Sequence, residues 1–261
     1  MAGRRRGGWV RLVAAGAVVL AVAGVSGCAA GRDDMSEAPV KRQSFPLAGK
    51  SLTVDSGDTD VVLVESDVRE VEAERQVAAW GLLSGEPEAE WTMRDGTLTL
   101  RVRCESAVMG GCAARHQVKV PRGVAVTVKD DNGSVRAEGF ASPLTMGSDS
   151  GELVVRRARG PLDLRSDSGE IRVEDTTSSR VAARTDSGEV RLALEAAPEL
   201  VDTASGSGEV AVDLPRGDTR YAVETRSGSG GISVDVPTDR RSSHVVRATT
   251  DSGEVSVRGA N

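Results

Sequence analysis

The sequence is poor in aromatic residues, lysine, histidine and cysteine. Phe, Trp and Tyr together make up 2% of the 261 residues, so few large rings are available to fill a core. Val, Ala and Leu carry most of the apolar content, which suits a narrow core between β-strands. Lys accounts for only four of the 33 basic residues. Together with abundant Ala and Gly, this bias towards Arg indicates a GC-rich genome, such as that of an actinobacterium.

Residue patterns typical of catalysis or nucleic-acid binding are also missing. His116 and His244 lie far apart in the sequence, and neither accompanies a Ser or Cys nucleophile motif. The sequence has no phosphate-binding loop and no basic stripe. Its net charge is −6, and without the four arginines of residues 1–27 it would be −10. We therefore expect no catalytic residue, no cofactor, no resident metal and no nucleic-acid partner.

The first residues have the pattern of an export signal. A basic start is followed by an apolar run from Val13 to Val25, which is too short for a stable transmembrane span. Val25-Ser26-Gly27-Cys28 resembles a lipobox, the cleavage motif of bacterial lipoproteins. We expect residues 1–27 to be a lipoprotein signal peptide, with Cys28 becoming the lipidated N-terminus. The alternative is ordinary cleavage after Ala30, with Cys28 lost.

The polar residues 28–44 predict a flexible tether between this anchor and a folded domain. Two acyl chains would hold the protein stably on the outer face of the cytoplasmic membrane or on the cell surface. In such an exported protein, Cys104 and Cys112 are expected to close the loop between them as a disulfide. A metal site using these two cysteines and His116 is the less favoured alternative.

A short turn recurs seven times in the second half of the chain, at steps of 18 to 23 residues. Most copies read Asp-Ser-Gly-Glu, and the third-position glycine is present in every one. These glycines are Gly133, Gly151, Gly169, Gly188, Gly208, Gly230 and Gly253. A step near twenty residues is typical of a stacked repeat protein. The glycine predicts a positive φ angle, and the leading Asp predicts a carboxylate that accepts hydrogen bonds from turn amides.

Apolar residues alternate on both sides of each turn, which predicts a strand, a tight turn and a second strand. Two all-β architectures fit this pattern. In a β-solenoid each repeat is one coil, and equivalent strands stack in parallel about 4.8 Å apart. In an antiparallel meander or sandwich each turn is a hairpin tip. The similarity of successive copies favours the solenoid.

The pattern loosens towards the N-terminus. Residues 45–261 are expected to form one β-solenoid domain, with irregular coils and a cap at 45–120 and regular repeats at 121–261. Asp55-Ser56-Gly57-Asp58 is an imperfect copy of the turn within the first part. We expect Trp80 and Trp91 to pack in this cap.

The tandem Ser-Asp-Ser-Gly-Glu units, each followed by alternating apolar residues, resemble a bacterial family named "putative adhesins", a domain of unknown function. The likeness covers about residues 45–261 and is clearest from Val124 to Val257. It implies a right-handed β-helical fold, an envelope-associated role and no known catalytic residue. The chain departs from the pattern at Gly206, Gly228 and Gly231, which replace acidic residues.

Stacked coils would align the acidic residues of successive turns. The resulting ladder would contain Asp149, Asp167, Asp186, Glu152, Glu170 and Glu189. Carboxylates about 4.8 Å apart repel one another and favour hard cations, so weak Ca²⁺ binding is one hypothesis. The favoured alternative is that each Asp caps its own turn and each Glu pairs with a neighbouring Arg, such as Arg156, Arg172 or Arg191.

Three functions follow from these observations. The first is a non-catalytic, lipid-anchored surface protein that acts as an adhesin or scaffold and binds an unidentified envelope partner. The second is an accessory or sensor protein in an envelope stress response. The third, and least favoured, is a carbohydrate-active β-helical enzyme.

Overall fold

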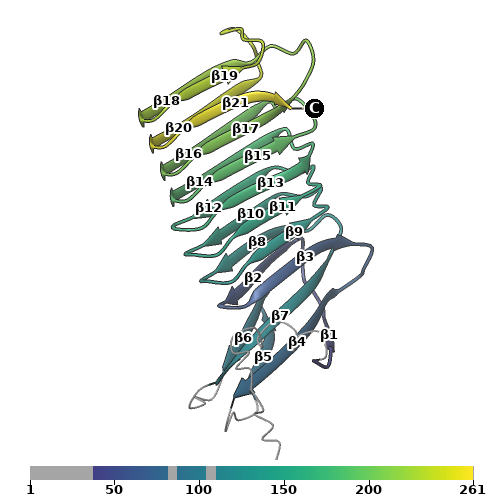
Figure 1. The fold of residues 1–261 in the computed structure, drawn as a ribbon. Coiled ribbons are helices and arrows are strands. Elements are labelled where there is room, and N and C mark those ends of the chain that lie inside the picture. Colours follow the sequence, from purple (N-terminus) through teal and green to yellow (C-terminus); the bar gives the residue numbers. More distant parts are fainter. Residues whose placement is uncertain (1–37, 82–86, 104–109, 261) are drawn as a thin grey trace, which may run out of the picture.

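The computed structural model describes residues 38–81, 87–103 and 110–260. These residues form 21 β-strands joined by turns and loops (Figure 1). No helix occurs in the described ranges, and so none there could cross a bilayer. The expectation of an all-β fold is confirmed.

The strands form two sheets, called here sheet A and sheet B. Sheet A has eleven strands, in the spatial order β1 (Lys41–Phe45), β4 (Val71–Gly81), β7 (Gly110–Pro121), β3 (Asp60–Ser66), β9 (Val135–Glu138), β11 (Leu153–Arg156), β13 (Ile171–Thr176), β15 (Val190–Leu194), β17 (Val210–Pro215), β21 (Val255–Ala260) and β19 (Ile232–Asp235). Sheet B has ten, in the order β18 (Ala222–Ser229), β20 (Val245–Ser252), β16 (Leu200–Ser207), β14 (Arg180–Ser187), β12 (Leu162–Ser166), β10 (Leu144–Ser148), β8 (Ala125–Asp130), β2 (Ser51–Gly57), β6 (Thr97–Arg103) and β5 (Glu88–Arg94).

Each repeat contributes one strand to each sheet, and the recurrent turn joins the two. We call such a pair of strands a rung. Equivalent strands of neighbouring rungs pair in parallel and in register: Leu144 lies beside Leu162, and Leu162 beside Val181. Because each turn links two different sheets, it is not a hairpin tip. The solenoid-like interpretation is therefore confirmed, and the antiparallel meander is wrong for the repeats.

The rungs do not stack in sequence order at the C-terminal end. The last rung, β20 and β21, lies between β16–β17 and β18–β19 in both sheets. The sixth repeat, β18 and β19, therefore forms the end of the stack, and we call it the terminal rung. The chain passes this end and then returns to fill the penultimate place (Figure 1).

At the other end, β2 and β3 form an additional rung around the turn at residues 55–58. This rung pairs in parallel with β8 and β9. Beyond it the pairing becomes partly antiparallel, with β4 between β7 and β1, and β5 on β6. Strand β1 begins at Lys41, four residues before the expected start of the folded domain. From β2–β3 to the terminal rung there are eight rungs, which span about 34 Å at 4.8 Å per step.

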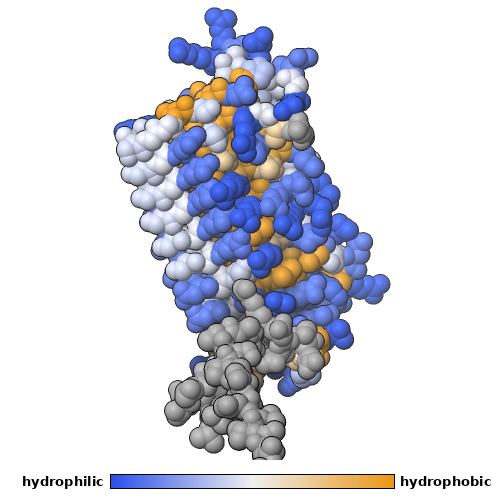
Figure 2. Space-filling model, in the orientation of Figure 1, coloured by the Kyte–Doolittle hydropathy of each residue, from blue (hydrophilic) through white to orange (hydrophobic). Residues whose placement is uncertain are grey.

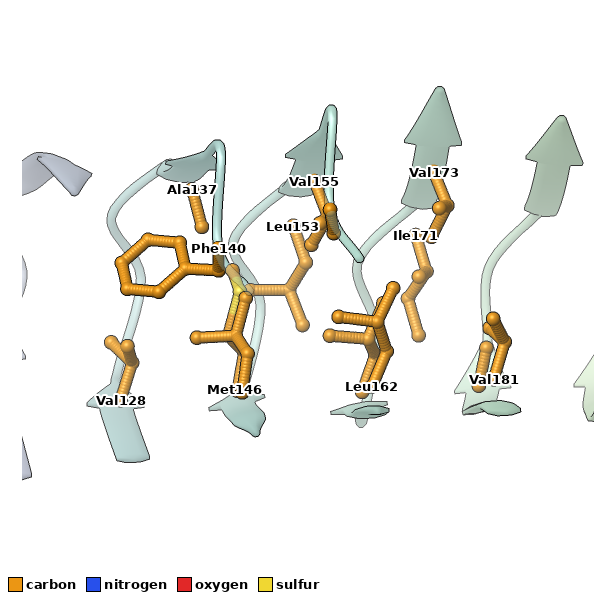
Figure 3. Close-up of a cluster of buried hydrophobic side chains, with 14 of the residues drawn as sticks. Val128, Ala137, Phe140, Met146, Leu153, Val155, Leu162, Ile171, Val173 and Val181 are labelled. Atoms are coloured by element: carbon orange, nitrogen blue, oxygen red, sulfur yellow. The ribbon is translucent and has the colours of Figure 1, made fainter. Parts of the chain in front are cut away.

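The core is a single layer of aliphatic side chains between the two sheets. Alternate residues of every repeat strand point inward, as Leu162 and Leu164 of β12 do. Figure 3 shows these side chains stacked from rung to rung, with Phe140 beside Met146. The core residues of the internal rungs are almost completely buried, because each rung is covered on both sides by its neighbours.

Candidate binding surfaces

The recurrent turns form one continuous column along the stack. It runs along the left side of Figure 2 as a pale stripe, because Ser and Gly dominate there. In the internal turns the glycine packs on the glycine of the next rung. A Cβ atom at Gly169 would lie 2.0 Å from the carbonyl oxygen of Gly151, and one at Gly188 would lie 2.2 Å from that of Gly169. No side chain fits at such distances.

This close stacking corrects the role predicted for the glycines. Only Gly230 and Gly253 of the seven have a positive φ. Gly133, Gly151, Gly169, Gly188 and Gly208 lie outside the positive-φ region, so their requirement is steric. The column needs glycine because the backbone of one rung lies where a Cβ atom of the next would be.

The same stacking accounts for the aspartates that are missing at Gly206 and Gly228. In spatial order the first turn position holds Asp186, Gly206, Asp251 and Gly228. A Cβ atom at Gly206 would lie 2.5 Å from the carbonyl oxygen of Asp186, and one at Gly228 would lie 2.5 Å from that of Asp251. Glycine thus alternates with aspartate where the rungs approach each other closely.

The residue before the leading Asp makes the hydrogen bonds predicted for that Asp. The amide of Gly151 donates to Ser148 Oγ at 2.7 Å, and that of Gly169 donates to Ser166 Oγ at the same distance. In later rungs Ser205 Oγ donates to the carbonyl of Gly188 at 2.8 Å. Asp149, Asp167 and Asp186 are exposed. The hydroxyl of this corner residue therefore makes the hydrogen bonds that hold the turn together.

In the first regular rung this corner is occupied by Asp130 instead of Ser or Thr. Its carboxylate is buried and accepts hydrogen bonds from Ser56 Oγ at 2.6 Å and Ser148 Oγ at 3.3 Å. Burial raises the pKa of Asp130 to about 6, although these hydrogen bonds and one from the Gly133 amide oppose the shift. Asp130 is thus a buried acid in the turn column, and the sequence signals it because the equivalent position in the other six repeats is Ser or Thr.

The glutamates of the predicted acidic ladder alternate with arginines on the outer face of sheet A. Arg172 of β13 lies 2.6 Å from Glu170 and 3.4 Å from Glu152, while Arg191 of β15 lies 2.7 Å from Glu170. Glu189 also pairs with Arg191. Burial and the neighbouring Glu209 and Glu170 raise the pKa of Glu189, while Arg191 lowers it.

These pairs offset the negative charge that would attract a cation. Within the described residues, no three His, Cys, Asp or Glu side chains are grouped closely enough to hold a metal ion. Weak Ca²⁺ binding along the ladder stays a prediction.

A second buried polar group lies near the N-terminal end. His116 of β7 is fully buried, and within the described part of the chain neither ring nitrogen has a hydrogen-bond partner. Burial lowers the pKa of His116 to about 4, and the charge of Arg75 adds to this shift. The Arg75 guanidinium lies 4.4 Å from the centre of the Trp91 ring, and its Nη1 donates to the carbonyl of Ala89 at 2.5 Å. Trp91 also packs edge-on against Phe45, so it acts as a packing residue, as predicted.

The cysteines can be placed only in part. Cys28 and Cys104 lie outside the described residues, whereas Cys112 lies in β7. The lipid anchor and the disulfide stay predictions. The side chain of Trp80 also lies outside the described part of the structure.

The terminal rung presents apolar side chains to solvent. Ile232 and Val234 of β19 are 49% and 40% exposed, whereas their counterparts Val255 and Val257 in β21 are completely buried. The four residues occupy equivalent inward positions, so the difference arises because no further rung covers β19. Figure 2 shows the corresponding apolar surface at the upper end, over β18 and β19. Among the described strands, none pairs with the outer edge of β18 or β19.

Comparison with known proteins identifies a family over the repeat region. The family model described as Toastrack DUF4097 matches residues 124–258, just over half of the chain. Among curated proteins there is no match.

Several solved structures resemble the chain at low sequence identity. A putative adhesin from Parabacteroides distasonis is 14% identical, with a TM-score of 0.47, over 85% of this chain and 98% of the other. A putative adhesin from Bacteroides fragilis is 11% identical, with a TM-score of 0.44, over 84% and 96%. A putative cell adhesion protein from Clostridium sporogenes is 9% identical, with a TM-score of 0.37, over 85% and 100%. Likeness at this level identifies no ligand.

Proposed function

This chain belongs to the Toastrack DUF4097 family, and we propose that it is a non-catalytic surface adhesin that binds through its terminal rung. The observation that carries the proposal is the uncovered end of the stack. Ile232 and Val234 stay exposed there, although the same positions in every internal rung are buried. Exposed apolar residues beside unpaired strand edges are typical of protein-binding sites.

The position of this end supports an adhesive role. The described chain starts near β1, at the end of the stack opposite the terminal rung (Figure 1). If Cys28 is lipidated, the stack is held at its N-terminal end and the terminal rung faces away from the membrane. The parallel, in-register sheets make the stack a stiff spacer, and the polar segment at 28–44 supplies reach.

A carbohydrate-active enzyme and a sensor in an envelope stress response are less well supported by the structure. A carbohydrate-active enzyme needs a cluster of carboxylates, whereas the glutamates of sheet A are paired with arginines along its length. A sensor in an envelope stress response would use the same exposed end, so the two roles differ in the partner that is bound.

Cells that display the protein provide the test of adhesion. We expect wild-type cells to be retained on a layer of displaying cells, and Val234→Lys to abolish retention without lowering the amount displayed. The matched control is Val40→Lys, because Val40 is 44% exposed and lies at the opposite end of the fold. Retention that is equal for wild type and Val234→Lys would refute binding through the terminal rung.

The anchor is tested separately by metabolic labelling with a fatty-acid analogue. We expect label on the wild-type protein and none on Cys28→Ala. Label retained in Cys28→Ala, or no label on wild type, would refute lipidation at Cys28.

A further inference from the structure

Each strand of the terminal rung could pair antiparallel with the same strand of a second copy, because oppositely charged or apolar side chains would then face each other. We propose that the partner of the terminal rung is the terminal rung of a second copy of this chain, related by a two-fold axis across the end of the stack. This inference rests on the proposed adhesive function and names its partner. In such a dimer β18 pairs antiparallel with β18 of the second copy, and β19 with β19, so that both sheets continue across the interface.

In β18 the axis would pass through Thr225. Residues equally distant from Thr225 then face each other, which places Glu224 of each copy opposite Arg226 of the other. Both side chains are exposed on the outer face of sheet B. Oppositely charged pairs at facing positions stabilise antiparallel strands, and here one axis creates two of them. Thr225 and Val223, which point inward, continue the core of the stack.

In β19 the same axis would pass through Ser233. Ser233 lies four residues after Ser229 at the centre of the turn, and Thr225 lies four residues before it, so one axis can serve both strands. It places Ile232 of each copy opposite Val234 of the other. These are the two exposed apolar residues of the rung, and both would become buried as their counterparts in β21 are.

The turn of the terminal rung also lacks the acidic residues that would oppose this approach. The turn of the terminal rung is Gly228-Ser229-Gly230-Gly231, whereas the next turn inward contains Asp251 and Glu254. The loss of both acids from the outermost turn removes like-charge repulsion between two copies. Neither β18 nor β19 contains Pro or Lys, the residues that commonly protect edge strands from pairing.

The connection from β19 to β20, residues 236–244, extends past the terminal rung (Figure 1). It contains Arg240 and Arg241, both exposed. Because the axis reverses the strands, this segment of one copy would lie beside the turn column of the other, where Asp251 and Glu254 are the nearest acids. The two ends are therefore complementary in charge as well as in apolar surface.

The interface is small. Eight residues of β18 span about 26 Å, and the end of a two-sheet stack has an area of roughly 400 to 500 Å² per copy. We therefore expect a weak dimer, with a Kd in the micromolar range, that becomes effective when many copies on one surface meet many on another. Since the anchors would lie at the two far ends, the dimer would connect two membranes.

Sedimentation of the purified full-length protein in detergent, over a range of concentrations, tests the interface. We expect dimers for wild type and Val40→Lys, and a Kd raised at least about tenfold in Val234→Lys, because a buried unpaired ammonium disfavours association. Every variant carries the same anchor, so any association through the lipid is common to all. A wild-type protein that stays monomeric, a dimer unaffected by Val234→Lys, or open-ended filaments would overturn the proposal.

Charge exchange tests the register. Glu224→Arg and Arg226→Glu should each weaken the homodimer, whereas an equimolar mixture of the two should form heterodimers, because each then meets its complement. Cysteine crosslinking tests the axis: Ser233→Cys should form an interchain disulfide, and Ser256→Cys, its neighbour one rung inside, should not. A mixture as weak as its components, or crosslinking at 256 in place of 233, would contradict this geometry.

The outcomes also separate this inference from the proposed function. If purified protein is monomeric but displaying cells adhere to bare cells in a Val234-dependent way, the second copy is the wrong partner and the adhesin remains. If the dimer forms but cells do not adhere, the interface stands and the adhesive role is wrong.

Discussion

At the scale of single residues, the fold depends on glycines that touch the backbone of the next rung. Gly151, Gly169 and Gly188 have no space for a Cβ atom, although their φ angles would tolerate one. The recurrence of glycine was visible in the sequence, but its cause was not. In a single turn, glycine is normally expected because of a positive φ angle. Here the reason is steric, and it becomes apparent only when several turns are stacked.

Gly169→Ala should therefore lower the free energy of unfolding by about 2 to 3 kcal/mol, since the added methyl group must displace the carbonyl of Gly151. Gly147→Ala in β10 is the matched control, because the nearest atom to its Cβ would be 3.9 Å away and its φ is not positive. Urea denaturation measures both. Equal effects of the two substitutions would contradict the stacking explanation.

Asp130 gives the fold a dependence on pH. Its pKa of about 6 lies above the ordinary value of 3.8, so the folded state binds the proton more tightly. The stability that this proton provides is complete below about pH 4 and is lost as the pH rises through 6. Asp130→Ser, which restores the corner residue of the other rungs, should stabilise the protein relative to wild type by about 2 kcal/mol more at pH 7.5 than at pH 4.

Denaturation of Asp130→Ser and wild type at the two pH values makes this comparison. Asp131→Ser is the control, because Asp131 is the adjacent exposed acid. A stability difference between Asp130→Ser and wild type that does not change with pH would show that Asp130 is ionised normally.

His116 affects the pH dependence of stability in the opposite direction, since it destabilises the fold at low pH. Its folded pKa of about 4 lies below the ordinary value of 6.5, so its contribution to stability is complete above pH 6.5 and is lost as the pH falls through 4. In His116→Leu the loss of stability between pH 7 and pH 4 should be smaller than in wild type by about 3 kcal/mol. Equal acid sensitivity in wild type and His116→Leu would contradict burial of a neutral imidazole.

Among the elements, the positions of the strands could be predicted from the sequence more accurately than the pairing between strands. Alternation of apolar residues predicts the strands on both sides of each turn, and β12 and β13 lie where Leu162, Leu164, Ile171 and Val173 indicate. Parallel stacking follows from the similarity of the copies. The antiparallel pairing of β4 with β7 could not be predicted in this way, because neither strand contains the repeat.

Arg172 of β13 connects two rungs, because it pairs with Glu152 of the neighbouring rung as well as with Glu170 of its own. Arg172→Met should lower stability by about 1 kcal/mol at low salt and by less at high salt, because Glu152 and Glu170 then repel each other. Arg165→Met is the control, since Arg165 pairs with Asp163 of its own strand and is well exposed. Thermal melts at two salt concentrations measure the difference. If both variants behave alike, the ion pairs between rungs add nothing.

At the scale of the whole molecule, the order of the rungs is the feature that sequence could not provide. Every rung carries the same apolar pattern and the same turn, so β16–β17 can accept either the sixth or the seventh repeat with similar pairing. The final two steps of 22 and 23 residues are the longest, and the extra residues lie in connections such as 236–244 that let the chain pass the end and return. The exposure of Ile232 and Val234 depends on this exchange, because the sixth repeat would otherwise be covered.

If the far end of this stack binds the far end of another copy, beads coated with the protein should aggregate. Beads that carry the protein attached through its N-terminal end should aggregate with one another, and should ignore beads that carry Val234→Lys or no protein. Wild-type beads that remain dispersed, or that bind wild-type and Val234→Lys beads equally, would contradict the account.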